Sequence, residues 1–154
     1  MDRLHRPPAR LTAPEAVNDA SACLVTYGLG KDWLLANPGM LCWDLVAYLR
    51  RVQDDGGLIS HAHPFRENVD IVRLVPDHVG AVEVLNGGRS DERNQYALDY
   101  ATSFRLPHTA GSDIHSITKK RLCGMSFPRR LGGGRDFMNA VKSGEGLIFD
   151  ETLQ

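Results

Sequence analysis

The sequence has few cysteines and no long apolar segment, and both absences limit what the protein can be. Its 154 residues contain only three cysteines, too few and too widely spaced for the disulfide framework of a small secreted domain. We therefore expect unpaired thiols and a cytoplasmic, reducing environment. No apolar run approaches the length of a membrane span, and the amino-terminal stretch MDRLHRPPARLTAPEAV lacks the apolar core of a secretory signal.

A strong net charge is also missing. The formal net charge is -1 and the pI about 6.6, which gives no electrostatic reason to expect binding to nucleic acid or to a membrane surface.

Several catalytic motifs are absent as well. The chain has no CxxC zinc spacing, no G-x-S-x-G elbow, no P-loop and no Rossmann glycine pattern. Ser112, Asp113 and His115 lie too close together in the sequence to form a hydrolase triad readily.

What is present is an alternation of strand-like and helix-like segments. We expect an irregular segment over residues 1–20 and one domain over 21–154. Apolar patterns predict strands at 21–27, 57–62, 79–86, 106–112, 121–127 and 146–151. Helical spacing predicts helices at 42–55, 91–104 and 135–144, with Ser90 as an N-cap, and a helical turn at 70–75. The alternation predicts an α/β fold with mostly parallel strands.

Two polar clusters follow predicted strands. The first is His61-Ala-His63-Pro-Phe-Arg66 and the second is Asp113-Ile-His115. In parallel α/β folds, binding sites are built at the carboxyl ends of strands. Residues two apart on a strand point to the same side, so each pair could face one cavity. Imidazole and carboxylate together suit zinc, manganese or iron.

Each cluster also has an ordinary interpretation. A histidine near a strand end is usually solvated or hydrogen-bonded, and an Asp in a loop usually bonds the local backbone. Two clusters at equivalent strand ends favour a site, whereas His78 and His108 have no partner at useful spacing. Glu83, opposite in direction to Val82 and Val84, either approaches the site or pairs with an arginine, because burying a lone carboxylate is costly. Asn86 is interpreted first as a turn residue.

The segments 56–66 (GGLISHAHPFR), 79–87 (VGAVEVLNG), 94–101 (NQYALDYA) and 109–116 (TAGSDIHS) together resemble the PHP superfamily, the polymerase and histidinol phosphatase domain. The resemblance runs in the same order over roughly residues 40 to 150. Its specific elements are the AHP and GSDxH motifs. The resemblance implies a distorted (β/α)7 barrel and a centre of two or three divalent ions that hydrolyses phosphoesters.

The resemblance also implies roles for individual residues. His63 is similar to the ligand histidine of the AHP element, and Asp113 and His115 are similar to the paired ligands of the last motif. Arg66 is well placed to bind the substrate phosphate. His61 has no clear counterpart in the family and could lie behind the ligands and support them, as could Asn86.

The chain departs from the family in its amino-terminal half. The H-x-H motif of the first strand and the bridging glutamate have no counterparts, so the chain resembles the carboxyl-terminal half of such a domain, a truncated form. The implied activity is hydrolysis of a phosphorylated small molecule or nucleotide by metal-activated water, impaired in this chain. The alternative is a non-catalytic metal-binding or interaction remnant, in which exposed sheet edges would favour self-association.

Overall fold

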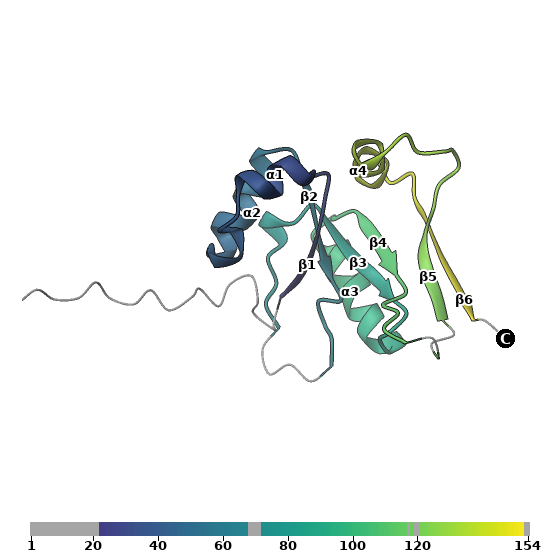
Figure 1. Cartoon of the computed structure of the whole chain (residues 1–154). Helices are drawn as coiled ribbons and strands as arrows, with labels where there is room; N and C mark the ends of the chain where they lie inside the picture. Colours follow the sequence, from purple (N-terminus) through teal and green to yellow (C-terminus); the bar gives the residue numbers. More distant parts are fainter. Residues whose placement is uncertain (1–21, 68–71, 117, 119–120, 153–154) are drawn as a thin grey trace, which may run out of the picture.

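A computed structural model describes residues 22–67, 72–116, 118 and 121–152 (Figure 1). The segment 1–20, expected to be irregular, lies outside the described residues. All three cysteines are unpaired thiols, as the sequence predicts. Among the described residues, no helix combines the length and apolar character that crossing a membrane would require.

The described residues include six strands, which form two separate sheets. The larger sheet has the order β1-β2-β3-β4, formed by β1 (Cys23–Tyr27), β2 (Leu58–Ala62), β3 (Ala81–Asn86) and β4 (His108–Gly111). The pairings β2–β3 and β3–β4 are parallel, whereas β1 runs antiparallel to β2. The second sheet is an antiparallel ribbon of β5 (Arg121–Ser126) and β6 (Leu147–Thr152). All six predicted strands are therefore present.

The prediction of mostly parallel strands is wrong in part, because two of the four pairings between described strands are antiparallel. Nor do the described strands close into a barrel. Strand β4 contacts β5 without hydrogen bonding to it along a ladder, so the parallel sheet stays open at β4. A barrel requires every strand to pair on both sides, and that condition is not met here.

In the described parts of the chain, four α-helices accompany the sheets: α1 (Lys31–Ala36), α2 (Leu45–Asp54), α3 (Asp91–Ser103) and α4 (Gly134–Lys142). Short 3₁₀ turns lie at η1 (Met40–Cys42) and η2 (Pro76–His78). Side-chain caps begin two helices: the Asp44 carboxylate accepts the Ala47 N–H at 3.0 Å, and the Ser90 hydroxyl accepts the Arg93 N–H at 3.3 Å. The N-cap predicted at Ser90 is thus confirmed.

Two helical predictions need correction. Helix α1 was not expected from the sequence, because six residues between Gly30 and Asn37 are too short to show a helical period. The side chain of Asn37 donates to the Trp33 carbonyl at 2.8 Å and satisfies one of its last backbone groups. The helical turn expected at 70–75 is not seen over residues 72–75, and 70–71 lie outside the described residues. A 3₁₀ turn begins instead at Pro76.

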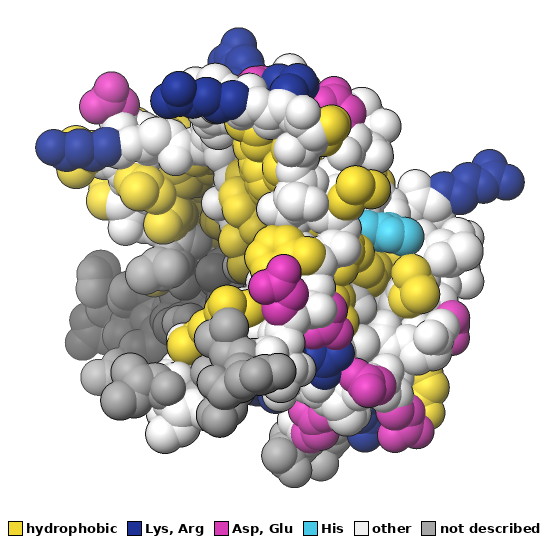
Figure 2. Space-filling view, turned by 90° about the vertical axis from the view of Figure 1, so that its right-hand side faces the viewer, with side chains coloured by type: hydrophobic (Ala, Val, Ile, Leu, Met, Phe, Trp, Pro, Cys, Tyr) yellow, Lys and Arg dark blue, Asp and Glu magenta, His cyan; other side chains and the backbone are white. Residues whose placement is uncertain are grey.

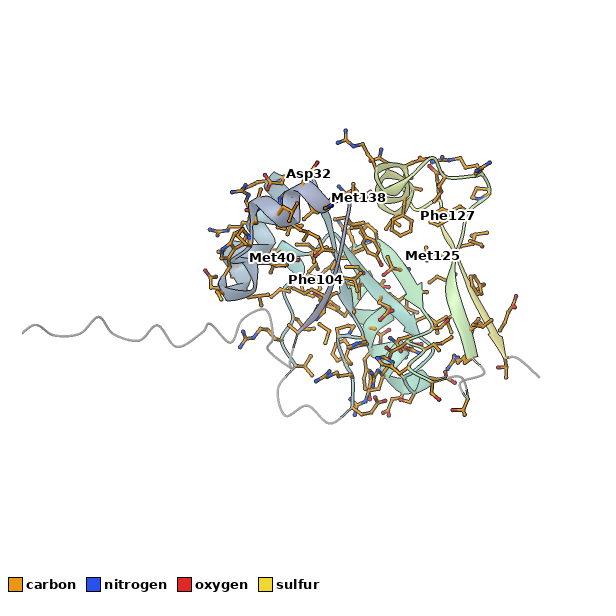
Figure 3. The ribbon with its side chains drawn as sticks, viewed as in Figure 1. Asp32, Met40, Phe104, Met125, Phe127 and Met138 are labelled. Atoms are coloured by element: carbon orange, nitrogen blue, oxygen red, sulfur yellow. The ribbon has the colours of Figure 1, made fainter. Side chains whose placement is uncertain are left out.

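The two faces of the larger sheet are covered by different helices. Ile59 packs in one cluster with Leu49 of α2, and Val82 packs in another with Tyr100 of α3. Their neighbours along the strands face the other way. Leu58 and Ala81 pack with side chains of α4, shown in Figure 3 with Met138 labelled. The sheet is therefore a middle layer between α2 and α3 on one face and α4 on the other.

The ribbon β5–β6 leaves apolar side chains in contact with solvent. Leu147, Ile148 and Phe149 of β6 are 66%, 38% and 36% exposed. Figure 2 views the molecule from the side of the ribbon and α4 and shows hydrophobic side chains across the middle of this face. An apolar patch on a surface is typical of a contact with another chain or segment.

Truncation of the α2 core contact tests this packing. Leu49 is fully buried against the sheet. We expect Leu49→Ala to lower the free energy of unfolding by about 2–5 kcal/mol, because it removes buried methyl groups and leaves a cavity. Urea unfolding followed by circular dichroism measures the change. The matched control is Leu35→Ala at a side chain that is 66% exposed, where the loss should stay below about 0.5 kcal/mol. Equal losses in both variants would contradict the packing.

Candidate functional site

The candidate site lies where the three parallel strands end. His63 follows β2, Asn86 is the last residue of β3, and Asp113 follows β4. Because parallel strands end at the same edge of their sheet, these residues come from separate segments to one edge (Figure 1). The sequence prediction that both motifs lie just past strand ends is confirmed for Asp113 and for His63 onward, whereas His61 lies within β2.

The backbone turns sharply at the two strand ends that carry the motifs. His63 and Asp113 have φ angles of 29° and 49°, in the left-handed region that residues other than glycine rarely adopt. Such residues cluster at binding and active sites, where surrounding contacts hold them in place. Strands β2 and β4 end at Ala62 and Gly111. The rule that residues two apart on a strand face the same way therefore does not extend to His63 or Asp113.

Glu83 holds this edge together. Its carboxylate oxygen Oε2 accepts the backbone N–H of His63 and the side-chain amide of Asn86, both at 2.9 Å. Burial, only partly offset by these two hydrogen bonds, raises the pKa of Glu83. Gly111 provides the space, since a Cβ there would lie 2.7 Å from Oε1 of Glu83. Of the two interpretations from the sequence, the structure thus supports the one in which Glu83 approaches the site.

Asn86 serves as a turn residue and as a partner of Glu83. Its side chain is buried, and its oxygen accepts the Gly88 N–H at 2.8 Å, which shapes the turn after β3. The Asn94 side chain from α3 fixes the Asn86 backbone by accepting from its N–H at 3.0 Å and donating to its carbonyl at 3.2 Å. The turn interpretation is confirmed, and the hydrogen bond that the Asn86 side-chain amide donates to Glu83 explains how Asn86 supports the edge.

Arg89 is a site residue that the sequence reasoning missed. Its Nη2 donates to Oδ2 of Asp113 at 3.0 Å, and its Nη1 donates to Oε2 of Glu67 at 3.2 Å. The sequence feature that could have identified Arg89 is a cation three residues beyond the end of β3, in the same turn as Asn86. The ion pair itself could not be recognised, because Arg89 and Asp113 are far apart in the sequence. The guanidinium therefore joins the loops after β2, β3 and β4.

His115 lies beside Asp113 but faces solvent. Its Nδ1 is 3.0 Å from the Asp113 carbonyl oxygen and 3.4 Å from Oδ1 of the same residue. The His115 side chain is 79% exposed, compared with 14% for Asp113. The two residues are therefore brought together, but by a local turn in which His115 bonds the residue two positions before it.

His61 and His63 have different surroundings. His61 is fully buried within β2, edge-on to the Tyr100 ring of α3 at 6.0 Å between centroids. Neither ring nitrogen of His61 has a hydrogen-bond partner among the described residues. Burial, followed by the nearby His63, lowers its pKa to about 4, so the ring is neutral. His61 thus packs against α3 and makes no hydrogen bond to the candidate ligands.

Arginines surround the His63 ring. Burial lowers the pKa of His63, and the positive charges of Arg89 and Arg66 lower it further. Nη1 of Arg66 lies 3.7 Å from the Cys23 sulfur of β1. Within the part of the chain that the structure describes, three buried nitrogens at this edge lack partners: Nδ1 of His63, Nε of Arg66 and Nε of Arg89. Unsatisfied buried nitrogens of this kind call for a ligand or ordered water.

The predicted metal ligands do not fit a divalent ion in this arrangement. No group of three or more His, Cys, Asp or Glu side chains among the described residues is arranged to hold one. The Asp113 carboxylate is bonded to a guanidinium, and His115 is directed to solvent. His63 and Asp113 lie at the same edge, but the donors needed for a closed coordination shell are not assembled.

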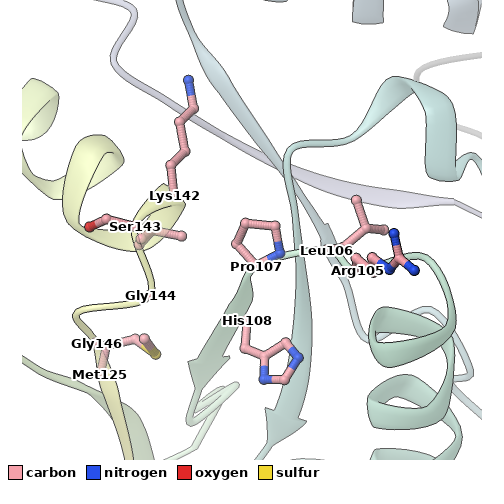
Figure 4. Close-up of a pocket in the computed structure, with 10 residues that line it drawn as sticks. Arg105, Leu106, Pro107, His108, Met125, Lys142, Ser143, Gly144 and Gly146 are labelled. Atoms are coloured by element: carbon pink, nitrogen blue, oxygen red, sulfur yellow. The ribbon is translucent and has the colours of Figure 1, made fainter.

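A separate cavity of about 360 Å³ lies at the other end of β4. Its lining includes Arg105, Pro107, His108, Met125 and Lys142. Figure 4 shows the Lys142 and Arg105 side chains extending in different directions rather than toward one another. These two cations of the lining therefore do not converge on one point.

Comparison with known proteins gives a fold resemblance. No protein-family model and no curated protein matches the chain. A solved structure that matches is a two-domain protein from Bacteroides vulgatus ATCC 8482 containing a predicted PHP-like metal-dependent phosphoesterase. It shares 15% sequence identity over 83% of this chain and 44% of its own, with a TM-score of 0.56. A candidate metal-dependent phosphoesterase from Bifidobacterium adolescentis ATCC 15703 shares 23% identity over 62% and 35%, with a TM-score of 0.40.

The first of these similarities shows that the described residues have a PHP-like fold. The chain spans less than half the length of either structure. The fold predicted by the motifs is thus confirmed in its general form, a mixed α/β arrangement with a parallel sheet. The closed barrel is not among the confirmed features.

The pH dependence of stability tests whether the His61 ring is buried and neutral in the folded chain. Between pH 6.5 and about 4, the His61 ring binds a proton in the unfolded chain but stays neutral in the folded chain, because burial lowers its pKa to about 4. The resulting stability is present above pH 6.5 and is lost as the pH falls, by up to about 1.4 kcal/mol per pH unit. His61→Leu should remove this part of the slope in urea unfolding at pH 7 and pH 5. His115→Gln, at the exposed ring, should keep it. An unchanged slope in His61→Leu would contradict the assignment.

Proposed function

We propose that this chain is a PHP-like phosphoesterase domain that binds the phosphate group of a small molecule or nucleotide at the carboxyl edge of β2, β3 and β4. The observation that carries the proposal is the group of unpartnered buried nitrogens of His63, Arg66 and Arg89 at that edge. Guanidinium groups match the oxygens of a phosphate in geometry and charge. The PHP-like fold supports the same ligand class.

In this proposal the chain's own residues bind and orient the phosphate ester. Arg66 donates to phosphate oxygens, and Glu83 fixes the His63 backbone so that the neutral ring stays at the edge. A divalent zinc, manganese or iron ion would supply activated water, which is the chemistry such ions provide in phosphoester hydrolysis. Because the described ligands do not fit such an ion as arranged, hydrolysis requires further ligands or a rearrangement at Asp113.

Binding of phosphate is the first test. Arg66→Gln should weaken binding of inorganic phosphate about tenfold, since a hydrogen bond to a charged group contributes about 1.5–3 kcal/mol. Isothermal titration calorimetry on the full chain measures the affinity. The matched control is Arg50→Gln, which removes the same charge from the exposed side of α2. Equal affinity in wild type and Arg66→Gln would remove Arg66 from the site.

Hydrolysis is the second test. We expect release of phenolate from an aryl phosphate to require added Mn²⁺ or Zn²⁺ and to stop with a chelator. Asp113→Asn should lower the rate at least about tenfold, because an amide is a weaker ligand than the carboxylate that would help to hold the ion. Asp32→Asn on exposed α1 is the control. Hydrolysis that survives chelation and Asp113→Asn would contradict the proposal.

A non-catalytic interaction module is the second candidate function. Its support is the ion pair that occupies Asp113, together with the exposed apolar side chains of β6. In this alternative the chain binds another copy of itself through the β5–β6 ribbon. Sedimentation velocity distinguishes the two functions. A dimer that dissociates in Phe149→Ser but lacks hydrolysis under every metal condition would favour the module over the enzyme.

A further inference from the structure

The ion pairs of Arg89 at the candidate site are not used in the proposed phosphate binding, which draws on the unpartnered Nε of Arg89 and not on its two terminal nitrogens. The Arg89 guanidinium donates to Asp113 through one terminal nitrogen and to Glu67 through the other. The side chains are partly buried: Arg89 is 23% exposed and Asp113 14%, while Glu67 at 36% is the most accessible. The pair of Arg89 and Asp113 is therefore shielded from solvent more than a typical surface ion pair.

Backbone contacts hold the network in place. The Arg89 N–H donates to the Asn86 carbonyl at 3.1 Å, which ties the residue to the end of β3. The second oxygen of Glu67 accepts the Ser90 N–H at 3.4 Å, so the same carboxylate contacts two successive residues of this turn. Backbone hydrogen bonds of this turn therefore help to fix the position of Arg89, in addition to the ion pairs of its side chain.

Negative groups surround the guanidinium. Asp113 and Glu67 bond it directly, and the negative charge of Asp113 adds to burial in raising the pKa of Glu83. Arg89 acts in the opposite direction on Glu83, so all three carboxylates lie within electrostatic reach of its charge. The neutral His63 ring lies close to the same charge. Carboxylates and an imidazole are the donors that a divalent ion would otherwise use.

We propose that Arg89 is the resident cation of this site and that it excludes a divalent ion from Asp113. A guanidinium and a divalent ion repel each other strongly at a separation of a few ångströms, so both cannot share one carboxylate cluster in a partly buried setting. Arg89 thereby sets how tightly the chain binds metal. The proposal goes beyond the phosphoesterase function and does not depend on hydrolysis.

Binding of Mn²⁺ alone tests the proposal. Electron paramagnetic resonance measures free Mn²⁺ in titrations of wild type, Arg89→Gln and Arg50→Gln, without substrate. Arg89→Gln should bind Mn²⁺ roughly tenfold tighter than wild type or more, because the competing charge is gone and the carboxylates remain. Arg50→Gln changes the net charge equally on exposed α2 and should bind as wild type does. Equal or weaker binding by Arg89→Gln overturns the proposal.

Two further variants separate charge from folding. Arg89→Lys keeps the positive charge and should bind Mn²⁺ as weakly as wild type; tight binding by it would show that charge is not the barrier. Adding Asp113→Asn to Arg89→Gln should abolish the gain. Mn²⁺ should also raise the melting temperature of Arg89→Gln and leave that of wild type nearly unchanged, because only a bound ion stabilises the folded state.

The wild-type titration keeps the proposal testable even if Arg89→Gln fails to fold. Wild-type binding of Mn²⁺ tighter than about 10 μM that is lost in Asp113→Asn would overturn the exclusion by Arg89, while leaving the phosphoesterase proposal intact. Weak wild-type binding that Asp113→Asn does not change supports the exclusion. Failure of the hydrolysis assay has no bearing on either result.

Discussion

The parallel pairing of β2, β3 and β4 is the constraint on which the rest of the structure depends. It buries both faces of three short strands, so α2 and α3 must cover one face and α4 the other. It also brings three strand ends to one edge, where His63, Asn86 and Asp113 meet without being close in the sequence. If one of these strands reversed direction, its motif would move to the opposite end of the sheet.

The single carboxylate of Glu83 then connects this edge to the sheet. Val82 and Val84 pack on the α3 face, so Glu83 lies on the other face, beside Gly111 of β4. By bonding the backbone of His63 and the side chain of Asn86, it satisfies its own buried charge with neutral donors. The Arg89 guanidinium therefore donates its hydrogen bonds to Asp113 and Glu67 and not to Glu83.

The extent to which the sequence predicted this structure depends on how local each feature is. Strands and the longer helices follow from periodicity, and the Ser90 cap follows from a single hydroxyl before a helical run. The closed barrel implied by the resemblance is not formed by the described strands, because whether β4 pairs with β5 depends on contacts distant in the sequence. The Arg89–Asp113 ion pair was missed for the same reason: 24 residues separate the partners, and only the parallel register brings them together.

The same ion pair changes the meaning of the two motifs. A GSDxH element normally suggests metal because its carboxylate and imidazole are adjacent, but here the carboxylate has a cation already and His115 faces solvent. Charge balance at a partly buried carboxylate can be met by a guanidinium as well as by a metal ion, and a guanidinium needs no further ligands. A guanidinium can therefore hold the Asp113 side chain in place in this fold, so the position of that side chain does not require a metal ion.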